Sequence, residues 1–407
     1  MSALCDHPVI YYNLCAVCGE QVGLTASQTS SSSVPIGQAS LSLSVSSTEA
    51  ARRGAAQRSQ LLQQRKLSVV LDLDHTLLHC TCVPLANVRD ISFTKQDLLS
   101  RSTPEAAISF FDLDYHRYFI QIRPFATKLI KKLHSSNYQV YVFTMGTRAY
   151  ALKCLKILGV LSEIPETHVF SRDDVDPKSG RKTIIRIFPA GTTMTVIVDD
   201  KIDVWGSFAR VVHQVVPFLH WKGERSVAAE LELPPIPKEK CLLEVLELLN
   251  YIHLKFFEFI DKGNETNVAE IIKEKRSTAL THCRIYLCEI PIKDELHPLI
   301  TRAGGFLAST IEESTHLVCG NCDGNVVKCA RDLPGLFIVN PLWLYHSLCG
   351  LKWCHEAEYL IGMETVYGVN KEFCLEVVEI VKMIKKKEQE KFDHLLSDLD
   401  DSDFEFD

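Results

Sequence analysis

The sequence lacks the long apolar runs that mark membrane-spanning segments. No uninterrupted stretch approaches the roughly 20 apolar residues that a helix needs to cross a bilayer. The first residues, Met1 to Asp6, have neither the basic head nor the apolar core of a secretory signal. We therefore expect neither secretion nor a membrane partner. Charged residues at 23% and hydrophobic residues at 46% are ordinary values for a globular protein.

The chain also lacks a general excess of basic charge. Its formal net charge is −7. The segment 393–407 holds seven acidic residues and no lysine or arginine, so the imbalance lies in this tail and the rest of the chain is neutral. A neutral body offers no broad basic surface to a phosphate backbone. We therefore expect no direct binding of nucleic acid.

Fifteen cysteines do not indicate a disulfide scaffold here, because no secretory signal accompanies them. We interpret them as reduced thiols, core residues and metal ligands. Cys5, His7, Cys15 and Cys18 supply four soft donors, enough for one tetrahedral Zn²⁺. The alternative is a set of free cysteines in an unstructured terminus. Residues 1–22 are therefore a candidate zinc-binding element.

The middle of the chain has the alternation of an α/β domain. Residues 23–66 are predicted to be a Ser-rich linker followed by a short helix, because 24–50 are rich in Ser, Thr, Ala and Gln. From 67 to 223, apolar strands alternate with amphipathic helices, which favours a parallel sheet. The stretch 82–122 is long and alternating, so we expect a small β insertion there. The predicted strands are 67–72, 138–143, 168–170, 195–199 and 211–216, and the predicted helices are 125–134 and 147–158.

Three further segments follow this domain. Residues 224–279 are predicted to be a helical connector, with a strongly apolar helix at 238–261 and a more polar one at 266–276. The first helix is apolar on more than one face, so we expect it to be buried between two units. Residues 280–366 form a separate small α/β unit. Residues 367–407 run from a basic helix into the acidic tail.

The clearest chemical signal is an apolar strand that ends in two carboxylates. Asp72 and Asp74 follow Val69, Val70 and Leu71. Ligands of α/β sheets bind at the carboxyl ends of the strands. Two carboxylates there are costly to desolvate unless a cation or a reaction uses them. An acidic turn without function is the alternative.

A second apolar strand ends in the same way, at Asp199 and Asp200. Its carboxyl end is expected at the same edge of the sheet, where carboxylates suit a hard divalent cation such as Mg²⁺. Here too an acidic turn is the alternative. Thr144 follows a third strand, and Lys182 and Arg123 are cations between these motifs.

The segment from Leu71 to His79 resembles the nucleophile motif of the haloacid dehalogenase superfamily. Its sequence, Leu-Asp-Leu-Asp-His-Thr-Leu-Leu-His, resembles even more closely that of phosphatases of the RNA polymerase II C-terminal domain. Arg-Pro, strand-Thr, Lys and Asp-Asp follow in the family's order. The resemblance covers 67–223 and implies a haloacid-dehalogenase-like Rossmannoid parallel sheet.

This resemblance implies a role for each carboxylate. Asp72 is the nucleophile that forms an aspartyl-phosphate, and Asp74 is the general acid and base. Mg²⁺ is held by Asp72, by the main-chain carbonyl of Asp74 and by the Asp199–Asp200 pair. Asp200 is the expected direct ligand, and Asp199 orients or ligates.

The resemblance also implies groups that bind the phosphate. Thr144 corresponds to the phosphate-binding hydroxyl, although a helix N-cap would equally place a threonine there. Lys182 corresponds to the phosphate-neutralising lysine, with Lys178, Arg181 and Arg186 as rivals. Arg123 corresponds to the arginine ahead of the first core helix and is expected to clamp phosphate or substrate, with a surface ion pair as the alternative.

Residues 280–366 resemble a BRCT domain. The features that carry this are a strand at 284–287, Gly304-Gly305 after a helix, the strand 315–318, and Asn340-Pro341 leading into a helix with Trp343. Phosphopeptide-binding BRCT units place Ser/Thr-Gly after the first strand, where this chain has Cys288-Glu289. A phosphate pocket in this unit would use Lys328 as its lysine. Because Glu289 would repel phosphate, we expect this unit to dock a protein instead.

A catalytic core, a BRCT unit and an acidic tail together resemble the TFIIF-associating type of C-terminal-domain phosphatase. The resemblance implies a nuclear, Mg²⁺-dependent protein serine phosphatase that acts on the heptad repeats of the RNA polymerase II largest subunit. It also implies that the tail binds the winged-helix domain of a TFIIF subunit. The alternatives are the same chemistry on another phosphosubstrate, or a non-catalytic BRCT docking protein.

Overall fold

The computed structural model describes residues 5–22, 33–90, 108–189, 191–219, 239–320, 325–331 and 333–361. Residue contacts divide the chain into two compact units. The first comprises residues 1–279 with 346–352, and the second comprises 280–345 with 353–407. The predicted basic helix and acidic tail, 367–407, lie outside the described residues, as does the linker segment 23–32.

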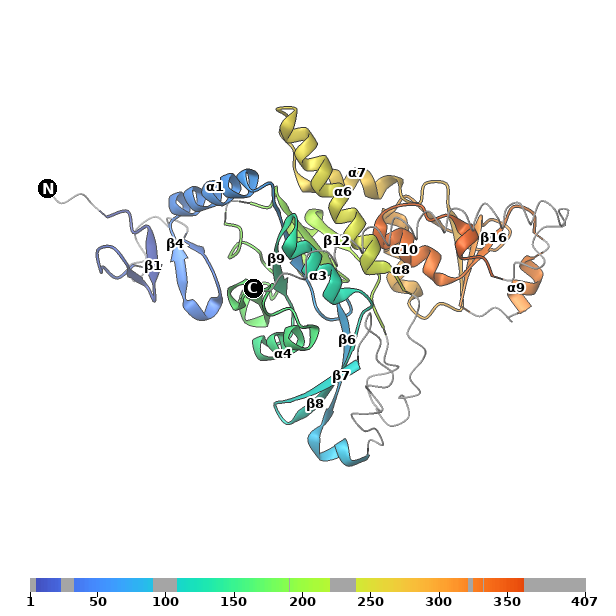
Figure 1. Cartoon of the computed structure of the whole chain (residues 1–407), viewed down its shortest axis with the longest axis horizontal. Coiled ribbons are helices and arrows are strands. Elements are labelled where there is room, and N and C mark those ends of the chain that lie inside the picture. The colour runs from blue at the N-terminus through green and yellow to red at the C-terminus, as the bar shows by residue number, and fades with distance from the viewer. Residues whose placement is uncertain are drawn as a thin grey trace, which may run out of the picture. The chain divides into compact units, whose positions relative to one another are not determined.

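A five-stranded parallel sheet forms the centre of the first unit (Figure 1), as predicted. Its middle strand, β5, is buried at every residue, and so is its neighbour β11. Such strands are apolar throughout because helices cover both faces of a parallel sheet. The order is β10 (Val169–Phe170), β9 (Tyr138–Phe143), β5 (Leu67–Leu71), β11 (Thr195–Asp199) and β12 (Val212–Gln214).

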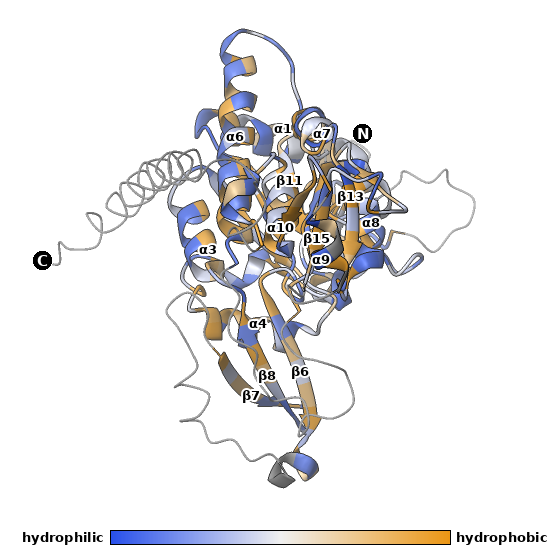
Figure 2. Ribbon diagram, turned by 90° about the vertical axis from the view of Figure 1, so that its right-hand side faces the viewer, coloured by the Kyte–Doolittle hydropathy of each residue, from blue (hydrophilic) through white to orange (hydrophobic). Residues whose placement is uncertain are grey.

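The register of this sheet brings the predicted site residues to one edge. Leu71 of β5 lies opposite Val198 of β11 and Val142 of β9. The residues that follow each strand, Asp72 and Thr144 among them, therefore leave the sheet side by side. Figure 2 shows hydrophobic residues, in orange, concentrated along central strands such as β11.

Helices α3 (Ala126–Ser135) and α4 (Arg148–Leu158) follow strands in the manner predicted. Four residues of α3 and five of α4 are buried, at the spacing of one helix face. Gly159 ends α4 with a left-handed φ of 67°, which a residue without a side chain adopts at little cost. Both helices therefore begin and end within a residue or two of the bounds that the pattern predicts.

The predicted β insertion is a three-stranded antiparallel sheet in the order β6-β8-β7. Figure 1 shows it, in blue and cyan, set apart from the central strands. A two-residue turn, Asp114-Tyr115, joins β7 to β8 with both φ values positive. The strands are β6 (Leu78–Pro84), β7 (Ile108–Leu113) and β8 (His116–Ile122), and a 3-10 helix, η2, spans Leu85–Asp90.

The two helices expected in a connector belong to the first unit. Helix α6 (Cys241–Asp261) and α7 (Val268–Thr278) match the predicted helices, but they pack with the central sheet. The Tyr138 hydroxyl donates to the carbonyl of Leu249, and His253 bonds to the carbonyl of Arg65. The helices are therefore a layer of the domain rather than a link from it.

No helix in the described residues is long and apolar enough to cross a membrane, and Figure 2 shows orange and blue alternating along α6.

The second unit is the small α/β structure that the sequence predicts. Its four parallel strands lie in the order β14-β13-β15-β16. Trp343 is fully buried, stacks on His316 with ring centroids 4.3 Å apart, and donates its indole N–H to Cys354 O. The elements are β13 (Arg284–Cys288), α8 (Lys293–Arg302), β14 (Phe306–Leu307), β15 (His316–Cys319), α9 (Asn325–Ala330) and β16 (Phe337–Val339). Helix α10 (Pro341–Gly350) begins in this unit, and its residues from His346 on belong to the first unit.

Part of the predicted linker is folded instead. A four-stranded antiparallel sheet, in the order β2-β1-β4-β3, precedes helix α1 (Ser47–Gln63). The linker prediction is wrong for 33–46 because its average composition hides a few spaced apolar residues, Ile36 and Val45, which pack with Ala50 of α1. The strands are β1 (Val9–Tyr11), β2 (Leu14–Cys15), β3 (Val34–Pro35) and β4 (Leu43–Val45). The remaining short helices are η1 (Ala39–Leu41), η3 (Glu166–His168), η4 (Arg172–Asp174), η5 (Asp203–Val211) and η6 (Glu356–Glu358).

Candidate active site

Asp72 lies directly after β5, at the carboxyl end of the central sheet. Its backbone N–H donates to Val198 O, which ties the end of β5 to β11. The residue is only 5% exposed. One of its oxygens, Oδ1, accepts a hydrogen bond of 2.6 Å from Lys182 Nζ. The candidate nucleophile is thus held on a rigid element beside a cation.

Lys182 joins the two acidic motifs. Its Nζ lies 2.6 Å from Asp72 Oδ1 and 2.7 Å from Asp199 Oδ2. The side chain is 2% exposed, whereas the rival cations Lys178 and Arg181 are exposed. Burial acts to lower the pKa of Lys182, but attraction to Asp72 and Asp199 outweighs it and raises the pKa. The lysine is therefore an ammonium inside the site.

Trp205 holds Asp199 from the other side. Its indole N–H donates to Asp199 Oδ2 at 2.8 Å, and the backbone N–H of Lys201 donates to Asp199 Oδ1 at 2.7 Å. The ring also packs on Phe143 in a T-shaped arrangement with centroids 5.6 Å apart. Trp205 therefore packs in the core and also orients a carboxylate.

Asp72, Asp199 and Asp200 form one buried set of carboxylates. One ligand atom from each lies within 4.8 Å of the others, a set that could hold a metal ion. Burial, together with repulsion from Asp199, raises the pKa of Asp72 well above its ordinary value and that of Asp200 to about 7. Three carboxylates beside one ammonium leave excess negative charge, which a divalent cation would neutralise.

Asp74 lies apart from this set and has its own partners. Its Oδ2 accepts a hydrogen bond of 3.2 Å from the Thr144 hydroxyl, and its Oδ1 accepts one of 2.5 Å from the Tyr150 hydroxyl. Burial and the nearby Asp74 raise the pKa of Tyr150 far above its ordinary value, so the phenol keeps its proton. The half-buried carboxylate is thus aimed by two hydroxyl donors.

A tight loop after Asp74 is hydrogen-bonded to the second acidic motif. His75 has a φ of 62°, and the backbone N–H groups of Leu77 and Leu78 both donate to Leu73 O. Thr76 is fully buried, and its hydroxyl accepts from the backbone N–H of Asp200 at 3.1 Å. The threonine of the Asp-x-Asp-x-Thr motif therefore fixes one carboxylate loop to the other.

Thr144 is placed beside Asp74 rather than at a helix end. Its Oγ1 accepts from the backbone N–H of Gly146 at 2.9 Å while the hydroxyl donates to Asp74. The N-cap of α4 is Thr147, whose side chain accepts from Tyr150 N. The capping alternative thus belongs to a different threonine, and Thr144 is left at the carboxyl edge of the sheet.

The structure gives Arg123 a different place from the expected phosphate clamp. Its guanidinium is 1% exposed and pairs with Glu239 at 2.6 Å. A third nitrogen donates to Thr76 O at 3.1 Å. Because its donors are taken inside the protein, Arg123 positions the Thr76 loop instead of presenting charge to a substrate. The alternative of a surface ion pair is also wrong, since the pair is buried.

Two features of the site were not predicted from sequence. Tyr150 lies within the predicted helix 147–158, and nothing in its spacing signals a bond to Asp74, 76 residues earlier. Gln214 at the end of β12 donates to Asp200 O at 2.8 Å. Its place within the predicted strand 211–216 is the one signal that the sequence offers for it.

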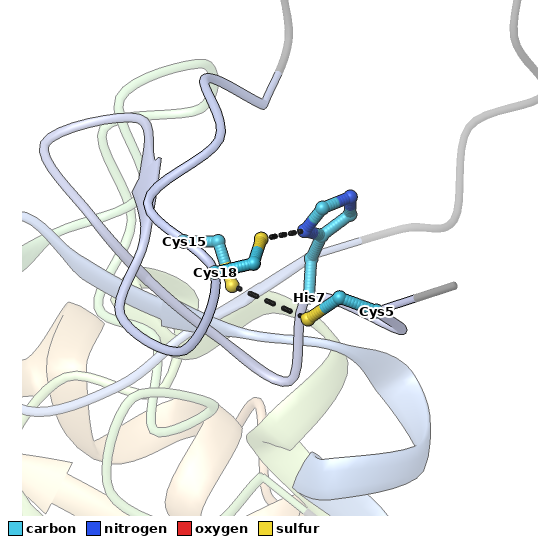
Figure 3. Close-up of side chains that lie close together, drawn as sticks. All are labelled: Cys5, His7, Cys15 and Cys18. Atoms are coloured by element: carbon cyan, nitrogen blue, oxygen red, sulfur yellow. Dashed lines mark hydrogen bonds between the residues drawn. The ribbon is translucent and has the colours of Figure 1, made fainter. Parts of the chain in front are cut away.

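The N-terminal donors are also brought together. Cys5, His7, Cys15 and Cys18 each offer one ligand atom, and these four atoms lie within 4.8 Å of one another (Figure 3). The arrangement is compatible with a metal ion and uses none of the residues around Asp72. Within the described residues, these two clusters are the groups of at least three His, Cys, Asp or Glu side chains that could hold one.

Comparison with known proteins shows a similarity to phosphatases. The model described as NLI interacting factor-like phosphatase matches residues 67–258. The chain is 29% identical over 390 residues to an RNA polymerase II C-terminal domain phosphatase of Caenorhabditis elegans, covering 88% of this chain and 56% of the relative. A Schizosaccharomyces pombe protein of the same name is 28% identical over 251 residues, covering 59% of this chain and 34% of the relative. The chain thus spans about half or less of the length of these relatives.

A solved structure agrees at the level of the fold. The structure of Fcp1, an RNA polymerase II C-terminal-domain phosphatase, matches 76% of this chain and 99% of its own with a TM-score of 0.52 and 24% identity. This likeness supports the mixed α/β architecture. The family model covers the central sheet, the β insertion and most of α6. Residues 67–258 of this chain are therefore similar to phosphatases described as NLI interacting factor-like.

Proposed function

We propose that this chain is a Mg²⁺-dependent protein serine phosphatase that acts through an aspartyl-phosphate on the heptad repeats of the RNA polymerase II largest subunit. The observation that carries the proposal is the contact of one buried ammonium, Lys182, with both Asp72 and Asp199. It unites the nucleophile motif and the second acidic motif, 127 residues apart, in one charged site. The family match supports a phosphatase, and the names of the relatives support the substrate.

In the first step, an Asp72 oxygen attacks the phosphorus of the phosphoserine. A bond from Asp72 to phosphorus forms as the bond from phosphorus to the serine oxygen breaks. Asp74 gives its proton to the departing serine oxygen, so the alcohol leaves neutral. The hydroxyl groups of Thr144 and Tyr150 hold the Asp74 carboxyl in the orientation this transfer needs.

In the second step, water hydrolyses the aspartyl-phosphate. Asp74, now ionised, takes a proton from the water as its oxygen attacks phosphorus. The bond between phosphorus and Asp72 breaks, inorganic phosphate leaves and both carboxyl groups return to their starting state. One residue thus serves as acid and then as base.

The cations of the site offset the charge that these steps bring together. A phosphate dianion and the carboxylates repel each other in a buried site. When bound by Asp72, Asp200 and the Asp74 carbonyl, with Asp199 orienting or ligating, Mg²⁺ would supply charge neutralisation and hold the phosphoryl group in line. Lys182 supplies a second, fixed positive charge. Thr144, once a phosphate is bound, offers its hydroxyl to a phosphoryl oxygen.

The remaining segments are proposed to serve substrate choice. We assign 280–366 as a BRCT unit that docks protein. Lys328 lies exposed on α9, and Glu289 follows β13 with a φ of 54°. An acidic side chain at that position would repel a phosphopeptide. The acidic tail is proposed to bind the winged-helix domain of a TFIIF subunit, and the enzyme to act in the nucleus.

A first experiment measures Mg²⁺-dependent phosphate release from a phosphoserine heptad-repeat peptide and from a small aryl phosphate. Wild type should turn over both, Asp72→Asn neither, and a chelator should stop the reaction. Asp112→Asn is the matched control, because Asp112 is an exposed acid paired with Arg117 on the insertion. It should keep wild-type rates.

The two substrates separate the alternatives. Turnover of the aryl phosphate without turnover of the peptide would keep the chemistry and replace the substrate with another phosphate ester. Inactivity of the wild type on both would favour a non-catalytic docking protein. The complete set of Asp72, Asp74, Thr144, Lys182, Asp199 and Asp200 in one site argues against that last alternative.

A further inference from the structure

The N-terminal donors come from two segments that a hairpin brings together. Cys5 and His7 precede β1, and Cys15 and Cys18 follow the turn to β2. The turn residues Tyr12 and Asn13 both have positive φ values, 45° and 64°, as in a two-residue hairpin turn. Ile10 then lies opposite Cys15. The backbone alone therefore places the Cys15–Cys18 turn against the incoming chain (Figure 3).

Two distances within the set match those of a tetrahedral zinc site. Cys5 Sγ and Cys15 Sγ are 3.8 Å apart, and Cys18 Sγ and His7 Nδ1 are 3.4 Å apart. A Zn²⁺ with Zn–S bonds of about 2.3 Å and a Zn–N bond of about 2.0 Å requires separations of about 3.8 Å between sulfurs and about 3.5 Å between sulfur and nitrogen. All four donors point toward one another in Figure 3.

A disulfide does not explain this arrangement. Bonded sulfurs lie about 2.05 Å apart, whereas Cys5 and Cys15 keep nearly twice that separation. A disulfide would also leave the imidazole and a third sulfur without a reason to converge. Three thiols and one imidazole are the donors that Zn²⁺ favours, whereas Mg²⁺ and Ca²⁺ take oxygen ligands.

Groups around the set orient its ligands. The backbone N–H of Val17 lies 3.4 Å from Cys15 Sγ, and Gly19, with a φ of 76°, closes the turn by donating to Cys15 O. His7 turns its Nδ1 to the cluster while its Nε2 lies 3.6 Å from Glu20 Oε2. A carboxylate on the far ring nitrogen is the usual partner of a metal-binding histidine and fixes its tautomer.

The sheet that carries these donors has a small buried core. Its buried core consists of Ile36, Val45 and Ala50 with three partly buried neighbours. Tyr11, Tyr12 and Val17 are each more than half exposed. Elements this small usually need a metal or a disulfide for stability, and the free energy of metal binding then becomes free energy of folding.

The same sheet is tied to the segment that carries Lys182. Strand β4 pairs with β1, with Ser44 opposite Ile10, and the chain just before β4 reaches the phosphatase domain. There the backbone N–H of Gly37 donates to Arg186 O at 2.9 Å, and that of Ala39 donates to Asp174 Oδ1 at 2.6 Å. These two contacts bracket Lys182 in the sequence.

We propose that Cys5, His7, Cys15 and Cys18 bind one structural Zn²⁺, and that the zinc-held sheet supports the 174–186 segment from which Lys182 reaches Asp72. The ion closes the β1–β2 hairpin, the hairpin holds β4, and the loop before β4 holds Arg186 and Asp174. Zinc takes no part in phosphoryl transfer, so this site is independent of the proposed Mg²⁺ chemistry.

Metal content of the full chain tests the site. Wild-type protein, purified and dialysed against a chelator of moderate strength, should retain one zinc per chain by mass spectrometry. His7→Ala and Cys18→Ser should lose it, whereas His7→Cys should retain it because a thiolate replaces the imidazole. Cys82→Ser is the matched control, since Cys82 is a free, exposed cysteine away from the set. A wild type without zinc, or Cys18→Ser with full zinc, would overturn the assignment.

Hydrogen exchange tests the support of the Lys182 segment. With Mg²⁺ restored after dialysis, the amides of 172–188 should exchange at least several-fold faster in zinc-free Cys18→Ser than in zinc-loaded wild type, while Cys82→Ser should match wild type. Unchanged exchange in a zinc-free protein would refute the support and leave the metal site standing. Because neither readout uses turnover, both can succeed or fail independently of the proposed phosphatase activity.

Discussion

At the scale of single residues, the site is a balance of buried charge. Lys182 lies between Asp72 and Asp199, and its ammonium would be costly to bury without both carboxylates. Asp200 adds a third carboxylate to the same space. One ammonium thus faces three carboxylates, and this set is compatible with a metal ion. A site built for packing alone would have no reason to retain this excess.

Tyr150 is predicted to matter to protonation of the leaving group. Tyr150→Phe removes one of the two donors on Asp74, a bond of the kind worth about 1.5–3 kcal/mol when one partner is charged. The turnover number on a phosphoserine peptide should fall about tenfold or more. The fall should be smaller on an aryl phosphate, because its leaving group needs less help from an acid. Steady-state kinetics on the two substrates measure the difference.

Tyr251→Phe is the control for this prediction. Tyr251 lies on α6, with its ring beside Lys275. Removing its hydroxyl should leave the turnover numbers on both the peptide and the aryl phosphate unchanged. Equal losses on both substrates for Tyr150→Phe would show that the phenol supports the site in general. A wild-type rate on the peptide would show that Thr144 alone orients Asp74.

Some residues of the site can be predicted from the neighbouring sequence, and others cannot. Asp72, Asp74, Asp199 and Asp200 each follow an apolar strand, so the sequence alone places them at one edge of a sheet. The place of Arg123 depends on Glu239, 116 residues later, which takes up its guanidinium. No sequence pattern around Arg123 or Glu239 predicts this ion pair. Contacts made over such separations are set by the tertiary fold, which periodicity does not encode.

At the scale of elements, the loop from β9 to α4 leaves no space for a side chain at Gly146. A Cβ there would lie 2.5 Å from a ring carbon of Tyr150 and 3.3 Å from Thr144 Oγ1. Gly146→Ala should therefore displace the ring that holds Asp74. We expect a loss of stability of about 1–3 kcal/mol, as for other overpacked positions, and a larger loss of turnover than Tyr150→Phe shows. Urea unfolding and peptide kinetics check the two parts.

The double variant Gly146→Ala/Tyr150→Ala isolates the cause. Removing the ring removes the clash, so the added methyl should then cost little stability relative to Tyr150→Ala alone. If the methyl costs as much without the ring, the strain lies elsewhere in the loop. Wild-type stability of Gly146→Ala would mean that the loop shifts at no cost.

Long periodic elements were the ones that sequence predicted well. The strand 138–143 coincides with β9, and the helix 147–158 differs from α4 by one residue. The strands β3 and β4, of two and three residues, were missed because elements that short carry no measurable period. The helices α6 and α7 were predicted, but not their place, since amphipathicity says which face is buried and not against what.

At the scale of the first unit, several buried histidines make stability depend on pH. His213 is fully buried, and its Nε2 bonds to Cys349 O at 2.8 Å. Burial, with repulsion from Arg276, lowers its pKa to about 3. Burial likewise lowers the pKa of His346 to about 4 and depresses the pKa values of His168 and His253. Each of these groups is neutral in the folded chain at physiological pH.

The sign of the effect follows from proton binding. Below pH 6.5 the unfolded chain protonates these histidines while the folded chain does not, so acid favours unfolding. The contribution of neutral His213 to the free energy of unfolding is fully present above pH 6.5. It declines as the pH falls toward 3. Between pH 8 and pH 5, His213 alone should cost about 2 kcal/mol of unfolding free energy. Urea unfolding of the full chain at the two pH values measures the fall.

His213→Gln should make this fall shallower by about the same amount, because an amide can donate to Cys349 O but does not titrate. Its stability at pH 8 should be lower than wild type, since glutamine fills the cavity less well. His297→Gln is the control, because His297 is exposed on α8 and should leave the pH dependence unchanged. An unaltered fall in His213→Gln would assign the acid sensitivity to other groups, with His346 the next to replace, because its pKa is also far below that of a free imidazole.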